Sequence, residues 1–155
     1  MKIMNDKYYM DIALEEAQKA FDEGEVPIGA VVVDDLGKVI SKAHNRREND
    51  KNATYHAELM AIDSACKVLG GWRLHMCTLY VTLEPCPMCG GAIINSRIKR
   101  VVYAAKDPKA GAFGSVLNFN AYPLNHKPEI SQGLCEKESL ELMSRFFGKL
   151  REKRK

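Results

Sequence analysis

Three side chains in the middle of the sequence have the chemistry of zinc ligands, namely His56, Cys86 and Cys89. Zinc binds imidazole nitrogen and thiolate sulfur readily. Two cysteines three positions apart at the start of a helix can turn toward one point, and the positive end of the helix dipole favours their thiolate forms. Three protein ligands leave the fourth tetrahedral position for water, which is typical of catalytic zinc. The sequence therefore predicts a catalytic zinc ion held by these three residues.

Glu58 lies two residues after His56, too close along the start of a helix to share the zinc ion comfortably. We expect it beside the zinc-bound water instead, since zinc can lower the pKa of that water to about 7. Because two thiolates offset the charge of the metal, a nearby proton carrier becomes important. Glu58 is therefore the predicted catalytic residue, which takes a proton from the water and delivers it to the substrate.

The Cys-x-x-Cys pair has two other interpretations. A structural zinc site would need a fourth ligand, which Cys77 or His75 could supply, although structural sites usually combine such a pair with a second close pair. A thioredoxin-like redox pair is disfavoured because a His-x-Glu motif precedes the cysteines and a proline lies on each side of Cys86. The sequence contains five cysteines, and this odd number argues against a framework of disulfides.

The composition fits one soluble domain over residues 1–155, with 46% hydrophobic and 28% charged residues. No apolar run approaches the ~20 residues of a membrane span. The N-terminus lacks the apolar stretch of a signal peptide, so we expect a cytoplasmic protein without a membrane partner. Five of the last seven residues (149–155) are Lys or Arg. This basic tail fits either nucleic-acid binding or a frayed, soluble terminus.

The pattern of apolar residues predicts the order of the helices and strands. Helices are expected at 7–22, 56–69, 87–96 and from residue 136 onward, and strands at 29–33, 38–44, 78–83, 100–105 and 129–134. Strands that alternate with helices indicate an α/β protein with helices on both faces of its sheet. The hairpin of the first two strands makes the five-stranded sheet mixed. The two helices that begin near His56 and Cys86 both follow strands, so their N-termini can meet at one edge of the sheet.

The pattern His-x-Glu…Pro-Cys-x-x-Cys is the signature of zinc-dependent nucleobase deaminases. Over nearly its whole length the sequence also resembles the family of bacterial tRNA-specific adenosine deaminases. The matching stretches are GEVPIGA (24–30), HNR (44–46), HAE (56–58), WRL (72–74), TLYVTLEPCPMC (78–89), SRI (96–98), DPK (107–109), GS (114–115), NH (125–126) and FF (146–147).

This resemblance implies a cytidine deaminase-like fold, which is a three-layer α/β/α arrangement around the mixed sheet. It implies a homodimer with one Zn²⁺ per subunit. It further implies hydrolysis of the wobble adenosine in a tRNA anticodon loop to inosine, with release of ammonia, after the base has been flipped into the active site.

The resemblance also implies roles for residues that would hold the base. Asn45 would hydrogen-bond the adenine and Ala57 would contact it through its backbone, while Val26, Pro27 and Ile28 would line the pocket. A simpler interpretation of Asn45 is a turn residue after a strand.

Other residues would contact the RNA around that base. Asp107 and the loop after it would touch flanking nucleotides, although an Asp-Pro pair is also typical of a turn. Phe146, Phe147 and Arg151 would lie near the RNA loop, whose splayed bases stack on aromatic rings. In the last helix the predicted apolar face consists of Leu140, Met143, Phe147 and Leu150. Phe146 lies off this face, so it is the better candidate for contact with RNA.

The sequence departs from the family pattern near the predicted site. Tyr55 and Phe113 stand where relatives commonly have small residues, and the loop at 118–124 is atypical. Bulky side chains there would narrow the pocket or shift the base. A free-base deaminase acting on guanine or cytosine would share the zinc and Glu58 but would not need the basic tail. A catalytically silent RNA-binding zinc protein would not require Glu58.

Overall fold

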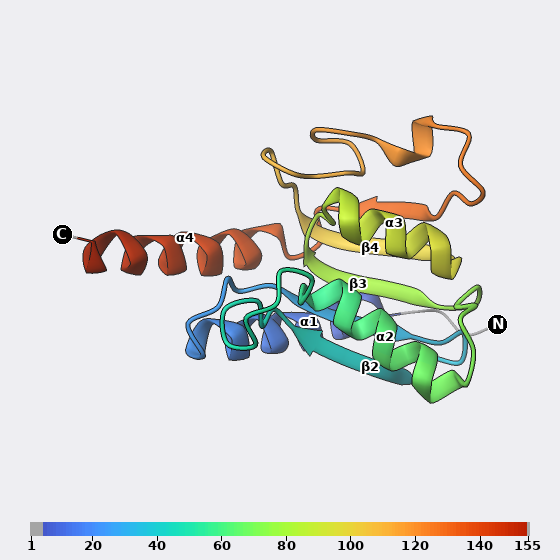
Figure 1. Cartoon of the computed structure of the whole chain (residues 1–155), viewed down its shortest axis with the longest axis horizontal. Coiled ribbons are helices and arrows are strands. Elements are labelled where there is room, and N and C mark those ends of the chain that lie inside the picture. The colour runs from blue at the N-terminus through green and yellow to red at the C-terminus, as the bar shows by residue number, and fades with distance from the viewer. Residues whose placement is uncertain (1–4, 155) are drawn as a thin grey trace.

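The computed structural model describes residues 5–154, and Figure 1 shows how their helices and strands are arranged. The elements follow in the order α1 (Asp6–Asp22), β1 (Gly29–Val33), β2 (Val39–His44), α2 (Ala57–Leu69), β3 (Thr78–Leu83), α3 (Pro87–Ser96), β4 (Arg100–Ala105), η1 (Phe119–Ala121), β5 (Glu129–Gln132) and α4 (Glu136–Lys153). The predicted order of helices and strands is confirmed. The fifth strand is shorter than predicted, and the short 3-10 helix η1 was not predicted.

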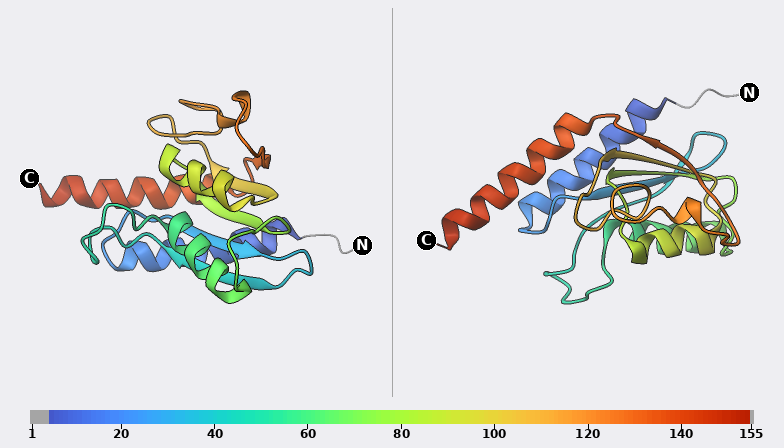
Figure 2. Two further views of the ribbon diagram at one scale, coloured as in Figure 1. Left: turned by 45° about the vertical axis from the view of Figure 1, so that its right-hand side comes forward. Right: turned by 90° about the horizontal axis from the view of Figure 1, so that it is seen from above.

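The five strands form one mixed sheet in the order β2-β1-β3-β4-β5. β1 runs antiparallel to β2 and β3, whereas β3, β4 and β5 run parallel to one another. Helices α2 and α3 cover one face of the sheet and α1 and α4 the other; Figure 2 shows these layers from above. The predicted three-layer α/β/α architecture is therefore confirmed. Within residues 5–154, no helix is both long enough and apolar enough to cross a membrane.

The internal strand β1 contributes to the core on both of its faces, because alternate side chains of a strand point to opposite sides. Val32 packs in the cluster beneath α2 and α3, whereas Val31 and Val33 pack against α1. At Gly29 the helix α1 approaches so closely that a Cβ atom would overlap the carbonyl oxygen of Ala13. Only glycine therefore allows α1 to lie on the sheet at this point.

The directions of the strands bring four connecting segments to one edge of the sheet. β2 and β3 both run antiparallel to β1, and β4 runs parallel to β3. The carboxyl ends of β2, β3 and β4 therefore lie at the edge where β1 begins. The segments that meet there are 23–28, 45–56, 84–86 and 106–118. Because α2 and α3 also start at this edge, it is the place where open α/β sheets commonly bind ligands.

The apolar face predicted for the last helix is wrong. Leu142 and Phe146 are buried, whereas Leu140 is 46% exposed and Phe147 is 39% exposed. The ring of Phe146 packs edge-on against that of Phe21 in α1, with centroids 6.2 Å apart. Apolar residues lie on two neighbouring sides of α4, and the position of α1 decides which side is buried. Phe146 therefore does not face outward as expected, and Phe147 is the ring at the surface.

The basic end of the chain is part of α4 rather than a separate tail. The helix continues to Lys153, and Figure 1 shows that its C-terminal half projects beyond the sheet. Lys149 and Lys153 lie beside Gly24, just after the end of α1. The basic end of α4 is therefore next to the edge where the connecting segments meet; Lys155 lies outside the described residues.

Candidate active site

The N-termini of α2 and α3 bring three potential metal ligands together. His56 is the N-cap of α2, Cys86 is the N-cap of α3, and Cys89 lies in the first turn of α3. The Nδ1 atom of His56 lies 3.6 Å from the Sγ atom of Cys86 and 3.6 Å from that of Cys89. All three ligand atoms lie within 4.8 Å of one another. This arrangement suits one metal ion held by an imidazole nitrogen and two sulfurs.

The two sulfurs differ in how readily they ionise. A hydrogen bond from the Cys89 thiol, together with one from His56, holds the pKa of Cys86 well below its usual range. The same hydrogen bond with Cys86, together with burial, raises the pKa of Cys89. Hydrogen bonding to Cys86 also raises the pKa of His56. The pair thus favours one thiolate and one thiol, and a divalent cation that displaces the remaining proton would be held by two thiolates.

Glu58, the second residue of α2, is buried beside this cluster. It is 4% exposed, and its Oε1 atom has no hydrogen-bond partner among residues 5–154. Burial raises the pKa of its carboxyl group to about 7. A group with a pKa near the working pH can both accept and donate a proton. A buried oxygen without a partner is also costly unless water or a ligand fills the space beside it. Glu58 therefore has the properties of a proton carrier with room for a reactant.

The fourth ligands that a structural metal site would require do not join the cluster. Among the described residues, His56, Cys86 and Cys89 form a group that includes neither His75 nor Cys77. Cys77 is buried in the core just before β3, at the opposite end of that strand. Six residues of strand separate the two ends by roughly 20 Å. The cluster therefore leaves one tetrahedral position open.

Asn45 connects the end of β2 to the segment that precedes β1. Its backbone N–H donates to Ile28 O at 3.1 Å, and its Nδ2 atom donates to Val26 O at 3.4 Å. Asn45 is buried, yet its Oδ1 atom has no hydrogen-bond partner within the described part of the chain. Val26 and Ile28 are half-buried and Pro27 is buried between them. The three expected pocket residues thus lie next to an amide oxygen that can accept a hydrogen bond.

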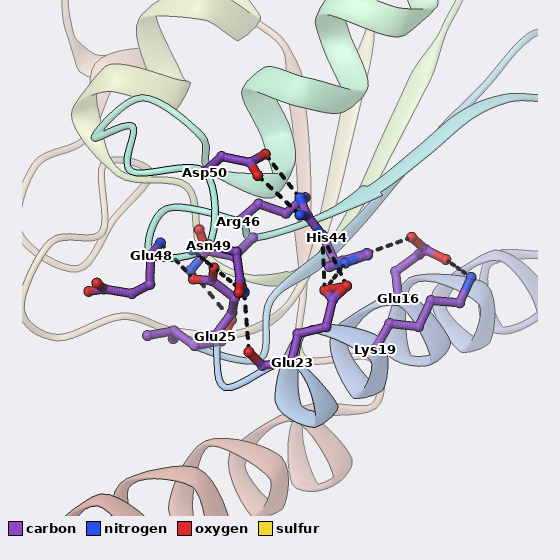
Figure 3. Close-up of polar contacts among 11 residues, drawn as sticks. Glu16, Lys19, Glu23, Glu25, His44, Arg46, Glu48, Asn49 and Asp50 are labelled. Carbon is purple, nitrogen blue, oxygen red and sulfur yellow. Dashed lines mark hydrogen bonds and ion pairs between the residues drawn. The ribbon is translucent and has the colours of Figure 1, made fainter.

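A cluster of charged side chains holds the residues on both sides of Asn45, as Figure 3 shows. The ring of His44 lies between the carboxylate of Glu16, in α1, and that of Glu23, which follows α1. Its Nδ1 atom lies 3.1 Å from Glu16 and its Nε2 atom 2.6 Å from Glu23. The guanidinium group of Arg46 donates to Glu23 and to Asp50. The end of β2 is thereby tied to the end of α1.

Glu25 is a second anchor for this region. It is fully buried, and its carboxylate accepts hydrogen bonds from the backbone N–H groups of Glu48 at 3.0 Å and Asn49 at 2.6 Å (Figure 3). The side chain of Asn49 also donates to it at 2.7 Å. No role was predicted for Glu25. No local signal in the sequence indicates its burial, because glutamate is usually exposed unless distant donors pair with it.

Two of the remaining expected contact residues, Ala57 and Asp107, lie at the same edge. Ala57 is the first residue of α2, where backbone N–H groups have no acceptor within the helix. Asp107 starts the loop after β4, and its Oδ1 atom accepts from the N–H groups of Lys109 and Ala110, as expected for a turn. Arg151 is exposed in the last turn of α4.

Comparison with known proteins places this geometry in a family. A model of the MafB19-like deaminase family matches residues 4–151. The chain is 50% identical to a tRNA-specific adenosine deaminase of Bacillus subtilis (strain 168), covering 97% of this chain and 93% of the relative. It is 48% identical to a tRNA-specific adenosine deaminase of Aquifex aeolicus (strain VF5), covering 96% and 97%.

A solved structure from studies of A-to-I editing by tRNA:A34 deaminases at the wobble position of transfer RNA is also similar. It matches with a TM-score of 0.84 and 47% identity, covering 87% of this chain and 98% of the other. This chain belongs to the family of tRNA-specific adenosine deaminases. The resemblance inferred from the sequence motifs and the cytidine deaminase-like fold are both confirmed.

Tyr55 and Phe113, the two bulky residues predicted to depart from the family pattern, lie in different surroundings. Tyr55 lines a hollow along the outer side of α2 with Leu59 and Lys67. Phe113 is buried, and its ring packs edge-on against that of Phe119 with centroids 6.1 Å apart. The loop at 118–124 supplies that partner, because Phe119 is the first residue of η1.

Proposed function

We propose that this protein is a zinc-dependent enzyme that hydrolyses the wobble adenosine of a tRNA anticodon to inosine and ammonia. The observation that carries the proposal is the buried Glu58, whose open carboxylate oxygen lies beside a cluster of one histidine and two cysteines. The names of the relatives, together with identities of 48 and 50% over nearly the whole chain, support the tRNA substrate. A tRNA substrate also favours a cytoplasmic location.

Zn²⁺ is the metal that this donor set fits best, because two thiolates and an imidazole suit zinc better than the oxygen-seeking Mg²⁺ or Ca²⁺. His56 would bind through Nδ1, and Cys86 and Cys89 through their sulfurs. When bound, the ion supplies a water molecule of lowered pKa at the open position. The open position and the unpartnered Oε1 atom of Glu58 make such a water the natural occupant of this site.

Glu58 moves the protons of the reaction. With a pKa near 7, its carboxylate accepts one proton from the attacking water and passes it to the ring nitrogen of the base. It then takes the second proton of that water, carried by the hydroxyl group on the reacting carbon, and passes it to the departing amine. Asn45 holds the base in place, because its buried Oδ1 atom is free to accept a hydrogen bond from it. Val26, Pro27 and Ile28 form the apolar wall, and the backbone of Ala57 provides a further polar contact.

The RNA around the flipped base lies along the edge of the sheet and the end of α4. Asp107 stands at the start of one bordering loop, and Arg151 on α4 carries part of the positive charge that phosphates require. The aromatic contact belongs to Phe147 rather than Phe146, because the ring of Phe147 is at the surface. Lys149 and Lys153 extend the same basic face.

The active unit is a homodimer. Large apolar side chains are exposed on and beside α3, namely Met88 of α3 and Leu117, Tyr122 and Leu124 of the loop after β4. Three of these also line a hollow against α3, and a second copy of the chain would cover them. Sedimentation velocity should give one species of twice the mass of the chain. A monomer at micromolar concentration contradicts this assignment.

The test of function measures inosine or ammonia release by the purified protein at moderate salt. The substrates are an anticodon stem-loop with adenosine at the wobble position, free adenosine, guanine and cytosine, and Glu58→Gln is the matched control. We expect inosine from the stem-loop alone, lost in the control, with activity that falls steeply as salt rises. Release of ammonia from guanine or cytosine, with the stem-loop unchanged, refutes the tRNA substrate.

A further inference from the structure

Glu84 is a buried carboxylate whose four hydrogen bonds all come from one loop. It follows β3 directly and is 2% exposed. Its Oε1 atom accepts from the backbone N–H of Asp107 at 3.1 Å and from the hydroxyl of Ser115. Its Oε2 atom accepts from the backbone N–H groups of Phe113 at 3.0 Å and Ser115 at 3.2 Å. These donors lie at both ends of segment 107–115, so the carboxylate joins the two ends of this loop.

The loop is shaped to fit this carboxylate. At Gly111, a Cβ atom would overlap the carboxyl group of Glu84. The adjacent Ala112 donates its backbone N–H to Pro85 O at 2.9 Å, which fixes the middle of the loop to the residue after Glu84. The hydrogen bonds that the Glu84 carboxylate accepts are charge-assisted, and such bonds are stronger than those between neutral groups. Glu84 is therefore the side chain that joins the two ends of the loop, while the bond to Pro85 O holds its middle.

The same side chain lies next to the proposed metal site in the sequence. Glu84 precedes Cys86 by two residues, so the segment that carries a metal ligand also carries the anchor of the loop. The loop returns toward α3 through Phe113, whose ring would lie in contact with a Cβ atom placed at Gly90. The loop therefore packs against the helix that carries Cys89.

We propose that Glu84 is a positioning residue for the RNA substrate, which fixes segment 107–115 so that Asp107 meets the nucleotides beside the reacting base. This inference rests on the proposed function. His56 and Cys89 lie on other segments, and the Oε1 atom of Glu58 has no hydrogen-bond partner among residues 5–154. Loss of the Glu84 carboxylate therefore weakens RNA binding more than it slows the chemical step.

The test compares Glu84→Gln with the matched control Glu129→Gln, since Glu129 is exposed at the start of β5. The glutamine has the same size but loses the charge, and its amide group would face N–H donors. Steady-state kinetics with the stem-loop should show KM rising about tenfold or more, with kcat changed by less than about threefold. Bound zinc should remain at the wild-type level, and the amides of segment 107–115 should exchange with deuterium faster.

A milder variant, Ser115→Ala, removes a single donor and should shift KM and amide exchange in the same direction by a smaller amount. Loss of zinc, or a fall in kcat at constant KM, would overturn the proposal and assign Glu84 to support of the metal segment. Faster exchange with an unchanged KM would also overturn it. A wild-type protein that is inactive on the stem-loop contradicts the proposed function instead. The exchange data still show whether Glu84 holds segment 107–115 in place.

Discussion

Truncation of the neighbouring residues Phe146 and Phe147 in α4 should lower the thermal stability to different extents. Phe146 is 7% exposed and packs against Phe21, whereas Phe147 is 39% exposed. Removal of a buried phenylalanine ring costs about 3–5 kcal/mol, and the site between two helices favours the lower end. For a chain of this length each kcal/mol lowers Tm by roughly 2–4 °C, so Phe146→Ala should lose about 6–12 °C. Phe147→Ala should lose less than about 4 °C.

The variants Phe146→Ala and Phe147→Ala also distinguish an effect on stability from an effect on RNA binding. If Phe147 stacks on a base of the anticodon loop, its removal should raise KM for the stem-loop roughly 5- to 150-fold, because such stacking contributes about 1–3 kcal/mol. Thermal unfolding and steady-state kinetics of both variants, measured in one buffer, provide the comparison. A larger loss of Tm for Phe147→Ala than for Phe146→Ala would refute the assignment of the buried face of α4.

Three further outcomes follow from the site and the fold. Glu58→Gln should lower kcat by about 10²–10⁴-fold while metal analysis still finds zinc, because the ligands are unchanged. Treatment with a strong chelator should abolish activity and lower Tm, and added Zn²⁺ should restore both whereas Mg²⁺ should not; activity that survives removal of the metal contradicts the mechanism. Asp6→Asn should cost about 1–2 kcal/mol at pH 7, because Asp6 makes a two-pronged ion pair with Arg100 at 2.8 and 2.7 Å. The hydrogen bond from Arg100 lowers the pKa of Asp6 below 3.8, so this stability is present above pH 3.8 and is lost as the pH falls further. Urea unfolding at pH 7 and pH 3 should therefore show a smaller difference between the variant and the wild type at the lower pH.

The metal ligands are the part of the site that the sequence alone predicts. His56, Cys86 and Cys89 were identified by side-chain chemistry and by their places at the starts of helices that follow strands. Each of these signals is local, since the spacing of apolar residues defines the helices and strands. The order of strands and helices then restricts the topology, and the N-termini of α2 and α3 meet at one edge.

The burial of Glu25 and Glu84, in contrast, could not be predicted from the sequence. Glu25 takes donors from residues 23 and 24 positions away, and Glu84 from residues up to 31 positions away. Nothing in the local sequence states which loops will supply those donors, because loop conformation depends on the packing of the whole edge. Their burial, and hence their importance, emerged with the tertiary structure.

The sequence by itself determined the chemistry of the site, the order of the elements and the family, because these depend on residue types and on short-range spacing. The tertiary structure decided which side of α4 is buried, where its basic end lies, and how Glu25 and Glu84 hold the loops around the opening. The physical reason is that a helix with apolar residues on two sides, or a carboxylate near a strand end, has several possible partners. Only the packing of distant segments selects one of them.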